Sequence, residues 1–166
     1  LQGPATRKTV YRIGSISKSI TAVLTVLLMQ NDMLDLSSNI NDYCPDFPNK
    51  GDKISISQLL THQGGIRHYD FDHIEEEYFS TRVYNSSAEA ISIFKNDTLV
   101  AKPGTKHFYS SYGYSLIGCA IENVMGTSFE HALEQYILNP VQMKNTMLDY
   151  PEQIIRVRLQ QTQACQ

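Results

Sequence analysis

The strongest hydrophobic pattern in the chain lies between Ser15 and about Asn31. No Pro or Gly interrupts this stretch, and Ala22 and Val26 extend its apolar surface. The other apolar positions recur at helical spacing: Ile16, Ile20, Val23, Leu24, Leu27 and Leu28. A helix that is apolar nearly all round must be covered on every side, so the pattern predicts a buried helix that starts at Gly14-Ser15.

Weaker patterns predict further helices and the loops between them. One short helix follows residues 54–60 and ends at Gly64, and three more cover residues 86–94, 115–124 and 129–138. Residues 9–13 form an extended stretch, whereas residues 32–48 and 67–82 are polar and indicate loops. Residues 156–166 carry no hydrophobic period. We therefore expect a mainly α-helical domain over residues 1–155 and an irregular C-terminal end over residues 156–166.

Composition and charge exclude two classes of partner. The 166 residues are 42% hydrophobic and 19% charged, which is ordinary for a single globular domain. The net charge is -3, and the scattered Lys and Arg residues form no basic stripe of the kind that binds nucleic acid. The longest apolar run, Ile20 to Met29, contains Thr21 and Thr25 and is too short to span a bilayer. We expect no nucleic-acid partner and no membrane span in this chain.

The three cysteines, Cys44, Cys119 and Cys165, stand far apart. Their number is odd, and no two of them form a Cys-x-x-Cys pair. This pattern argues against a disulfide framework and against a structural zinc site. The sequence therefore predicts three free thiols, with Cys119 inside a core helix.

Ser15 and Lys18 are the first candidates for catalysis. Three residues apart on a helix, they project from the same face, one turn apart. A serine hydroxyl becomes a good nucleophile only when a base takes its proton, and burial of a lysine favours the neutral amine that can do so. The helix N-terminus at Ser15 also favours a developing oxyanion. The pair could therefore supply a nucleophile and the group that takes its proton.

The same spacing occurs at Ser92 and Lys95, so the motif by itself is not specific. Ser92 lies inside a predicted amphipathic helix whose lysine can reach solvent. Ser15 instead follows a glycine and opens the most apolar helix of the chain. This context favours Ser15, and we interpret Lys95 as a surface residue.

Tyr109 and Ser111 form a second candidate group, in a predicted loop shortly after Pro103-Gly104. A phenol can relay a proton, and a small polar side chain two residues later can hydrogen-bond a lysine or a substrate. The alternative is a loop tyrosine that only packs its ring, since the chain has 10 tyrosines and residues 84–86 repeat the Tyr-x-Ser spacing.

A group of possible metal ligands lies in the predicted loop over residues 67–82. It comprises His68, Asp70, Asp72 and His73. Their spacing matches no known helix or hairpin site, so we interpret them as an exposed polar loop and expect no metal and no cofactor. Arg67 and His68 are alternatively residues of the rim of a substrate cleft.

Three segments together resemble the β-lactamase-related serine hydrolases, which include class C β-lactamases, penicillin-binding proteins, and related esterases and peptidases. Residues 12–19 look like the nucleophile motif, residues 59–66 like the Leu-Leu-Thr-His-x-Ser-Gly-Leu segment, and residues 102–114 like the segment around the family's tyrosine. They occur in the family's order and cover residues from about 9 to 150. Residues 67–69 and 94–97 look most like the branch that contains the mitochondrial serine β-lactamase-like protein.

The resemblance implies a fold and a set of roles. The family fold is α+β, a helical subdomain beside an antiparallel sheet, and this chain would hold the helical part and lack most of the sheet. Ser15 would form an acyl-enzyme, Lys18 would accept the serine proton, and Tyr109 would act as base or proton relay. Ser111 would bind substrate where many members have Asn, a departure that favours an esterase or peptidase over a β-lactamase.

The same resemblance implies that parts of the site lie outside the chain. The family's third motif, Lys or His with Gly two positions later, belongs to a strand downstream of the tyrosine. His62-Gln63-Gly64 fits that pattern, but it precedes the tyrosine, so we interpret His62 as structural. The family's first strands and first helix would precede Ser15. We therefore expect a piece of a longer protein, poorly stable and inactive alone, whose nucleophile helix has one uncovered apolar face.

Two readings compete with a hydrolase of small-molecule or peptide amides and esters. The first is a non-catalytic binding or assembly module of the same family, and the second is a fragment with no independent role. By resemblance the compartment is a bacterial cell envelope or periplasm, or a mitochondrion. The residues themselves record neither the compartment nor the oligomeric state.

Overall fold

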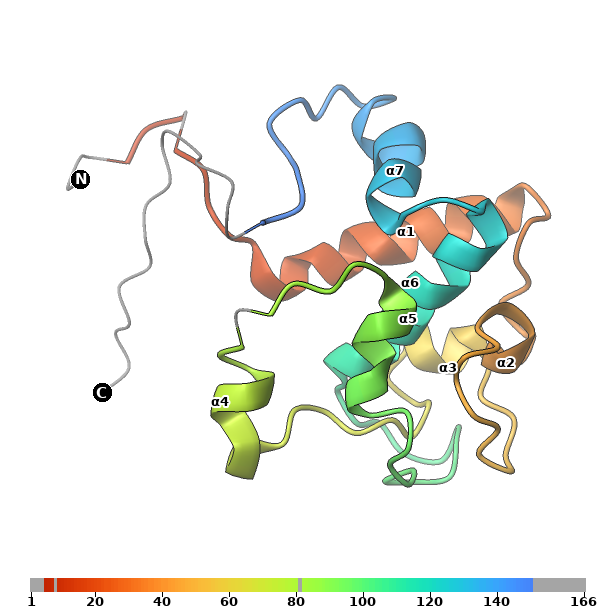
Figure 1. The fold of residues 1–166 in the computed structure, drawn as a ribbon. Helices are drawn as coiled ribbons and strands as arrows, with labels where there is room; N and C mark the ends of the chain where they lie inside the picture. The colour runs from red at the N-terminus through yellow and green to blue at the C-terminus, as the bar shows by residue number, and fades with distance from the viewer. Residues whose placement is uncertain (1–4, 8, 81, 151–166) are drawn as a thin grey trace.

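Helix α6 (Ser111–Met125) runs through the middle of the molecule (Figure 1). The computed structural model describes residues 5–7, 9–80 and 82–150. Five other α-helices pack against α6: α1 (Ser17–Gln30), α2 (Ile40–Tyr43), α3 (Ile56–Leu60), α5 (Ser87–Ala90) and α7 (Phe129–Leu133). An unbroken buried run from Leu116 to Ile121 explains why α6 takes this central place.

The remaining elements are short. They are the 3-10 turns η1 (Gly14–Ile16), η2 (Phe71–His73) and η3 (Ile91–Ile93), helix α4 (Ile74–Glu77), and η4 (Glu134–Leu138), a π-helical turn that continues α7. No strand occurs within the described ranges, where Asn39 and Ser55 form an isolated antiparallel bridge. The expected mainly helical architecture is therefore confirmed.

Side-chain caps explain where several helices begin. The Ser55 hydroxyl accepts the backbone N–H of Gln58 at 3.2 Å, while the Gln58 amide oxygen accepts the backbone N–H of Ser55 at 2.9 Å. Such a capping box satisfies two amides that the helix leaves without partners. Ser86 and Ser128 cap α5 and α7 in a simpler way, each by accepting the amide three residues later.

The structure differs from the predicted elements at the start of α6 and in two segments that were predicted as loops. α6 begins at Ser111, four residues before the predicted start, because the buried Ser110 hydroxyl caps it by accepting the amide of Gly113 at 3.0 Å. Residues 32–48, predicted as a loop, contain α2, and residues 67–82 contain η2 and α4. Polar caps at Asn39 and Asp70 explain the starts of α2 and η2, where the apolar pattern is weak.

Helix α1 is buried on one side only. Leu24 and Leu28 are fully buried, whereas Ile16 is 67% exposed and Val23 53% exposed. The prediction of a helix buried all round is thus wrong for the described residues, while the expected uncovered apolar face is present. None of the helices in the described ranges has the length and apolar character needed to cross a membrane.

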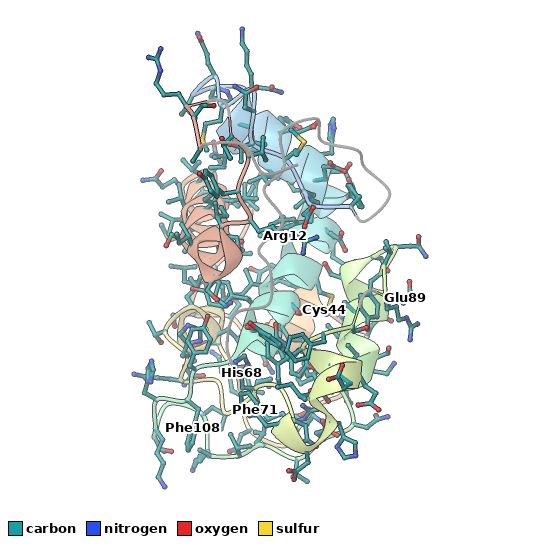
Figure 2. The ribbon with its side chains drawn as sticks, turned by 90° about the vertical axis from the view of Figure 1, so that its left-hand side faces the viewer. Arg12, Cys44, His68, Phe71, Glu89 and Phe108 are labelled. Carbon is teal, nitrogen blue, oxygen red and sulfur yellow. A yellow bond between two sulfur atoms is a disulfide. The ribbon has the colours of Figure 1, made fainter. Side chains whose placement is uncertain are left out.

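A disulfide joins Cys44, at the end of α2, to Cys119 in the middle of α6. Their Cα atoms lie 5.6 Å apart, and both side chains are buried, with Cys44 in the interior of the molecule (Figure 2). The prediction of free thiols is therefore wrong for these two residues. Sequence spacing could not reveal the pair because 75 positions separate the cysteines and only the packing of α2 on α6 brings them together. Cys165 lies outside the described residues.

Removing this disulfide is expected to weaken the fold. A Cys44→Ala/Cys119→Ala variant should lose about 2–5 kcal/mol of unfolding free energy in urea, because the bond restricts a long loop of the unfolded chain. A reducing agent should lower the stability of the unmodified protein by a similar amount. Cys165→Ala is the matched control, and a stability equal to that control would contradict the pairing.

Candidate active site

Gly14 controls how the chain enters the first helix. Its φ of 50° lies in the left-handed region, which glycine adopts without steric cost. The turn η1 then runs directly into α1, and the backbone N–H of Ser17 donates to the carbonyl oxygens of Gly14 and Ser15. Ser15 consequently lies exposed at the N-terminal end of α1.

Three polar side chains converge at this position. The Lys18 Nζ atom donates to Ser15 Oγ at 3.2 Å, and the phenol of Tyr109 donates to the same oxygen at 2.7 Å. Nζ also lies 5.1 Å from the centroid of the Tyr109 ring. The structure thus brings together the three residues that the sequence analysis proposed as catalytic. Ser15 and Lys18 come from η1 and α1, and Tyr109 lies 94 positions after Ser15.

The neighbours of Tyr109 favour its ionised form. Burial opposes ionisation, but the polar contacts with Lys18 and Ser15, the Lys18 charge and the nearby Ser111 side chain together lower the pKa of the phenol below its ordinary value of 10. A phenolate next to a serine hydroxyl is a base within reach of the proton it must remove. This arrangement can therefore activate Ser15 for attack on a carbonyl.

The loop that carries Tyr109 is anchored to the end of α3. The backbone N–H of Phe108 donates to the carbonyl of His62 at 2.8 Å, and that of Gly104 donates to the carbonyl of Gln63 at 2.8 Å. Gly65 makes this close approach possible, because a Cβ there would lie 2.2 Å from the backbone oxygen of Ala101. Gly65, in the segment over residues 59–66, therefore lets the chain that leads to Tyr109 pack closely against it.

Ser111, the expected substrate-binding residue, is half-buried at the first position of α6. Its backbone N–H donates to Nδ1 of His68 at 3.3 Å. His62, predicted to be structural, accepts the backbone N–H of Ser110 through Nδ1 at 3.2 Å. The ordering of the tyrosine loop thus involves two histidines.

Comparison with known proteins identifies the family. The sequence profile described as Beta-lactamase matches residues 2–159. The chain belongs to the β-lactamase family. It is 26% identical to the human mitochondrial serine beta-lactamase-like protein LACTB, over 92% of this chain and 40% of that protein. It is 31% identical to a beta-lactamase of Pseudomonas fluorescens, over 90% of this chain and 39% of that enzyme.

A solved structure has the same fold. The penicillin binding protein from Bacillus halodurans superposes with a TM-score of 0.81 at 22% identity, over 93% of this chain and 47% of that chain. The chain thus spans less than half the length of each of these relatives. The expected β-lactamase/transpeptidase-like fold is confirmed, and the described residues are mainly helical.

The second Ser-x-x-Lys match does not form a comparable site. Ser92 lies exposed in η3, and the described residues show no hydrogen bond between its side chain and that of Lys95. Lys95 is half-buried, and its carbonyl oxygen accepts Lys50 Nζ at 2.6 Å. Tyr84, in the second Tyr-x-Ser match, packs under the guanidinium of Arg82 instead of meeting a serine.

The loop over residues 67–82 is held by local bonds. Asp70 Oδ1 accepts the amide of Asp72 at 3.0 Å, and Asp70 Oδ2 lies 2.8 Å from His73 Nδ1. His68 instead faces Tyr109. The described part of the chain contains no cluster of three or more His, Cys, Asp or Glu residues arranged to hold a metal ion.

Arg67 and Glu77 form the strongest electrostatic contact near the site. Arg67 donates two hydrogen bonds of 2.9 Å to the carboxylate of Glu77 and one of 2.5 Å to Asp97. Glu77 Oε2 also accepts the phenol of Tyr112 at 2.7 Å and the amide of Asp70 at 2.8 Å. This network connects the loop that leads to α4 with α6. It shows that Arg67 is committed to ion pairs within the protein.

Breaking the network is expected to destabilise the fold. Burial works against the ionised carboxylate, but the bonds from Arg67, Asp70 and Tyr112 and the charge of Arg67 lower the pKa of Glu77 below its ordinary 4.5. A lowered carboxyl pKa adds stability that is present above 4.5 and is lost as the pH falls through the folded-state value. Glu77→Gln should therefore cost about 1–3 kcal/mol at neutral pH, measured by urea unfolding.

This loss should shrink on acidification, because protonation removes the same charge from the unmodified protein. Glu75→Gln on the same helix is the matched control, since Glu75 is exposed. A Glu77→Gln variant as stable as this control at neutral pH would show that the network does not hold the loop.

Proposed function

We propose that the protein containing this chain is a serine hydrolase that forms an acyl-enzyme on Ser15 from an amide or ester substrate. The observation that supports this proposal is the meeting of Ser15 Oγ with both the Lys18 ammonium and the Tyr109 phenol, at 3.2 and 2.7 Å. Nucleophile and base at such separations are the geometric requirement for covalent catalysis.

Tyr109 takes the proton in this proposal, and Lys18 keeps the phenolate stable until it does so. Ser15 Oγ attacks the carbonyl carbon while its proton passes to the phenolate oxygen. The phenol then gives that proton to the leaving nitrogen or oxygen as the carbonyl bond to it breaks. Water repeats the sequence on the acyl-enzyme and releases the acid. The shorter distance from Ser15 Oγ to the Tyr109 phenol, 2.7 Å against 3.2 Å to Lys18 Nζ, supports this assignment over one in which Lys18 is the base.

The substrate in this proposal is a small molecule or peptide with an ester or amide bond. Ser111 offers a hydroxyl beside Tyr109, where many family members have the amide of Asn. A hydroxyl is shorter and does not provide the paired donor and acceptor of an amide. This difference favours an esterase or peptidase over a β-lactamase.

Covalent labelling separates the hydrolase from a non-catalytic binding or assembly module. A fluorophosphonate probe should label the full-length protein, and Ser15→Ala should abolish the label because the nucleophilic oxygen is gone. Ser92→Ala is the matched control, since Ser92 has the same Ser-x-x-Lys spacing but no catalytic partners. Labelling that survives Ser15→Ala would remove this residue from the mechanism, and an unlabelled protein would favour the binding module.

The pH dependence of labelling tests the roles of Lys18 and Tyr109. In Lys18→Gln the phenolate loses its nearby positive charge, so the pKa of Tyr109 should rise towards 10. The labelling rate should then fall by about 10²–10⁴-fold at neutral pH and recover in part at alkaline pH. A loss that is equal at every pH would make the Lys18 amine the base.

We also propose that the 166-residue chain has no activity by itself. The support is the exposed apolar surface of η1 and α1, where Ile16 follows Ser15 directly and Val23 and Val26 lie farther along the helix. Exposed apolar surface on the helix that carries Ser15 favours association or unfolding over a rigid site. Turnover of an activated ester by the isolated chain, together with a cooperative thermal transition, would contradict this proposal.

A further inference from the structure

The ring of Tyr109 lies between two imidazoles. The His62 ring is 4.5 Å from it between centroids and inclined by 39°, and the His68 ring is 5.2 Å away at 85°. These contacts restrict the tyrosine from two directions, one ring packing against its face and the other meeting it nearly at a right angle. Figure 2 shows His68 at the end of the molecule that also carries Phe71 and Phe108.

Both imidazoles also hold the backbone that follows the tyrosine. Nδ1 of His62 accepts the amide hydrogen of Ser110, and Nδ1 of His68 accepts that of Ser111, at 3.2 and 3.3 Å. A ring nitrogen that accepts a hydrogen bond carries no proton, so each neutral ring must carry its proton on Nε2. The geometry therefore requires one tautomer of both histidines.

We propose that His62 and His68 are positioning residues, which keep Tyr109 in hydrogen-bond contact with Ser15 by clamping the tyrosine ring and accepting the next two amides through Nδ1. This inference rests on the proposed function and deepens it, because it concerns the alignment of the same base. Neither histidine is proposed to exchange a proton with the substrate.

The surroundings of the clamp favour neutral rings. Burial is the main cause that lowers the pKa of His62 below 6.5, followed by the charges of His107, Lys18 and His68. The rings of Tyr109 and Tyr114 complete its surroundings.

His68 has a similar environment on the other side of the tyrosine. Burial and the charge of Lys18 lower its pKa below 6.5, and the charge of Glu77 raises it. The aromatic rings of Tyr69, Phe71 and Tyr109 face it. The lowered pKa of each ring favours the neutral form that the clamp requires.

Protonation should open the clamp. In the neutral ring, Nδ1 accepts a hydrogen bond from the backbone amide. Once Nδ1 is protonated, its N–H faces the amide N–H, and repulsion between two donors replaces the bond. The amides of Ser110 and Ser111 must then move away, and the tyrosine moves with them. Because both pKa values are lowered, the clamp is intact above pH 6.5 and opens as the pH falls through the folded-state values.

Paired substitutions at His68 distinguish positioning from mere packing. The side-chain oxygen of Asn stands as many bonds from Cα as Nδ1 does, whereas that of Gln stands one bond farther, as Nε2 does. His68→Gln should slow fluorophosphonate labelling of the full-length protein by about 10²-fold, the cost of displacing a catalytic group by about 1 Å. His68→Asn should recover most of that loss, and the same order should hold for His62→Asn and His62→Gln.

The pH profile supplies the second measurement. For each protein, the labelling rate at pH 5 is divided by its own rate at pH 7.5. This ratio should be about tenfold higher for a His62→Asn/His68→Asn variant than for the unmodified protein, because Asn does not titrate. Ser15 labelling that responds equally to Asn and Gln, with identical acid profiles, would overturn the positioning role and leave the hydrolase proposal standing. Absence of Ser15-dependent labelling in the unmodified protein would instead sink the hydrolase proposal, and the positioning role with it.

A third measurement does not depend on catalysis or on the folding of any variant. Nitrogen-15 NMR of the imidazoles in the full-length protein should show both rings neutral at pH 7.5, with the proton on Nε2. A ring that is charged, or that carries its proton on Nδ1, would overturn the inference for that histidine. This result decides the matter if a Gln or Asn variant proves too unstable to measure.

Discussion

The burial of helix α6 among five other helices is the constraint on which the site depends. Once α6 lies in the middle of the molecule, its capped N-terminal end can face only one region of the surface, and the N-terminal end of α1 occupies that region. The two helices do not need to bend or separate to bring Ser15 and Tyr109 together. Their packing places the nucleophile and the proposed base at hydrogen-bond distance because both residues adjoin the ends of rigid elements.

The polar contacts near the N-terminal ends of α1 and α6 form two groups with different roles. Lys18, Ser15 and Tyr109 face solvent and remain able to exchange protons with a bound substrate. The contacts behind them are committed to the protein itself, through the Arg67 ion pairs and the two imidazoles. A rigid supporting layer matters because small displacements of a reacting group reduce rates steeply. The supporting layer therefore limits how far the tyrosine can move.

Much of the site could be predicted from sequence, for a definable reason. Ser15 and Lys18 are neighbours on one helix, so their spacing alone implies that they meet. Tyr109 entered the prediction through its local motif and the order of three motifs along the chain. His68, by contrast, was read as one of several loop residues, and its bond to Ser111 crosses 43 positions. The only available signal was its place in the Arg-His-Tyr stretch directly after the second motif.

The sequence by itself determined the candidate side chains Ser15, Lys18 and Tyr109, the family that they resemble and the mainly helical character of the chain, because these follow from local spacing and from motifs. Only the tertiary structure decided the disulfide between Cys44 and Cys119, the early start of α6 and the contacts of Tyr109 with two histidines. The physical reason is the same in each case: the deciding contact joins distant positions or depends on a cap made by one hydroxyl. A contact between distant positions and a cap made by a single hydroxyl do not change the periodic pattern of hydrophobic and polar residues, so that pattern cannot predict them.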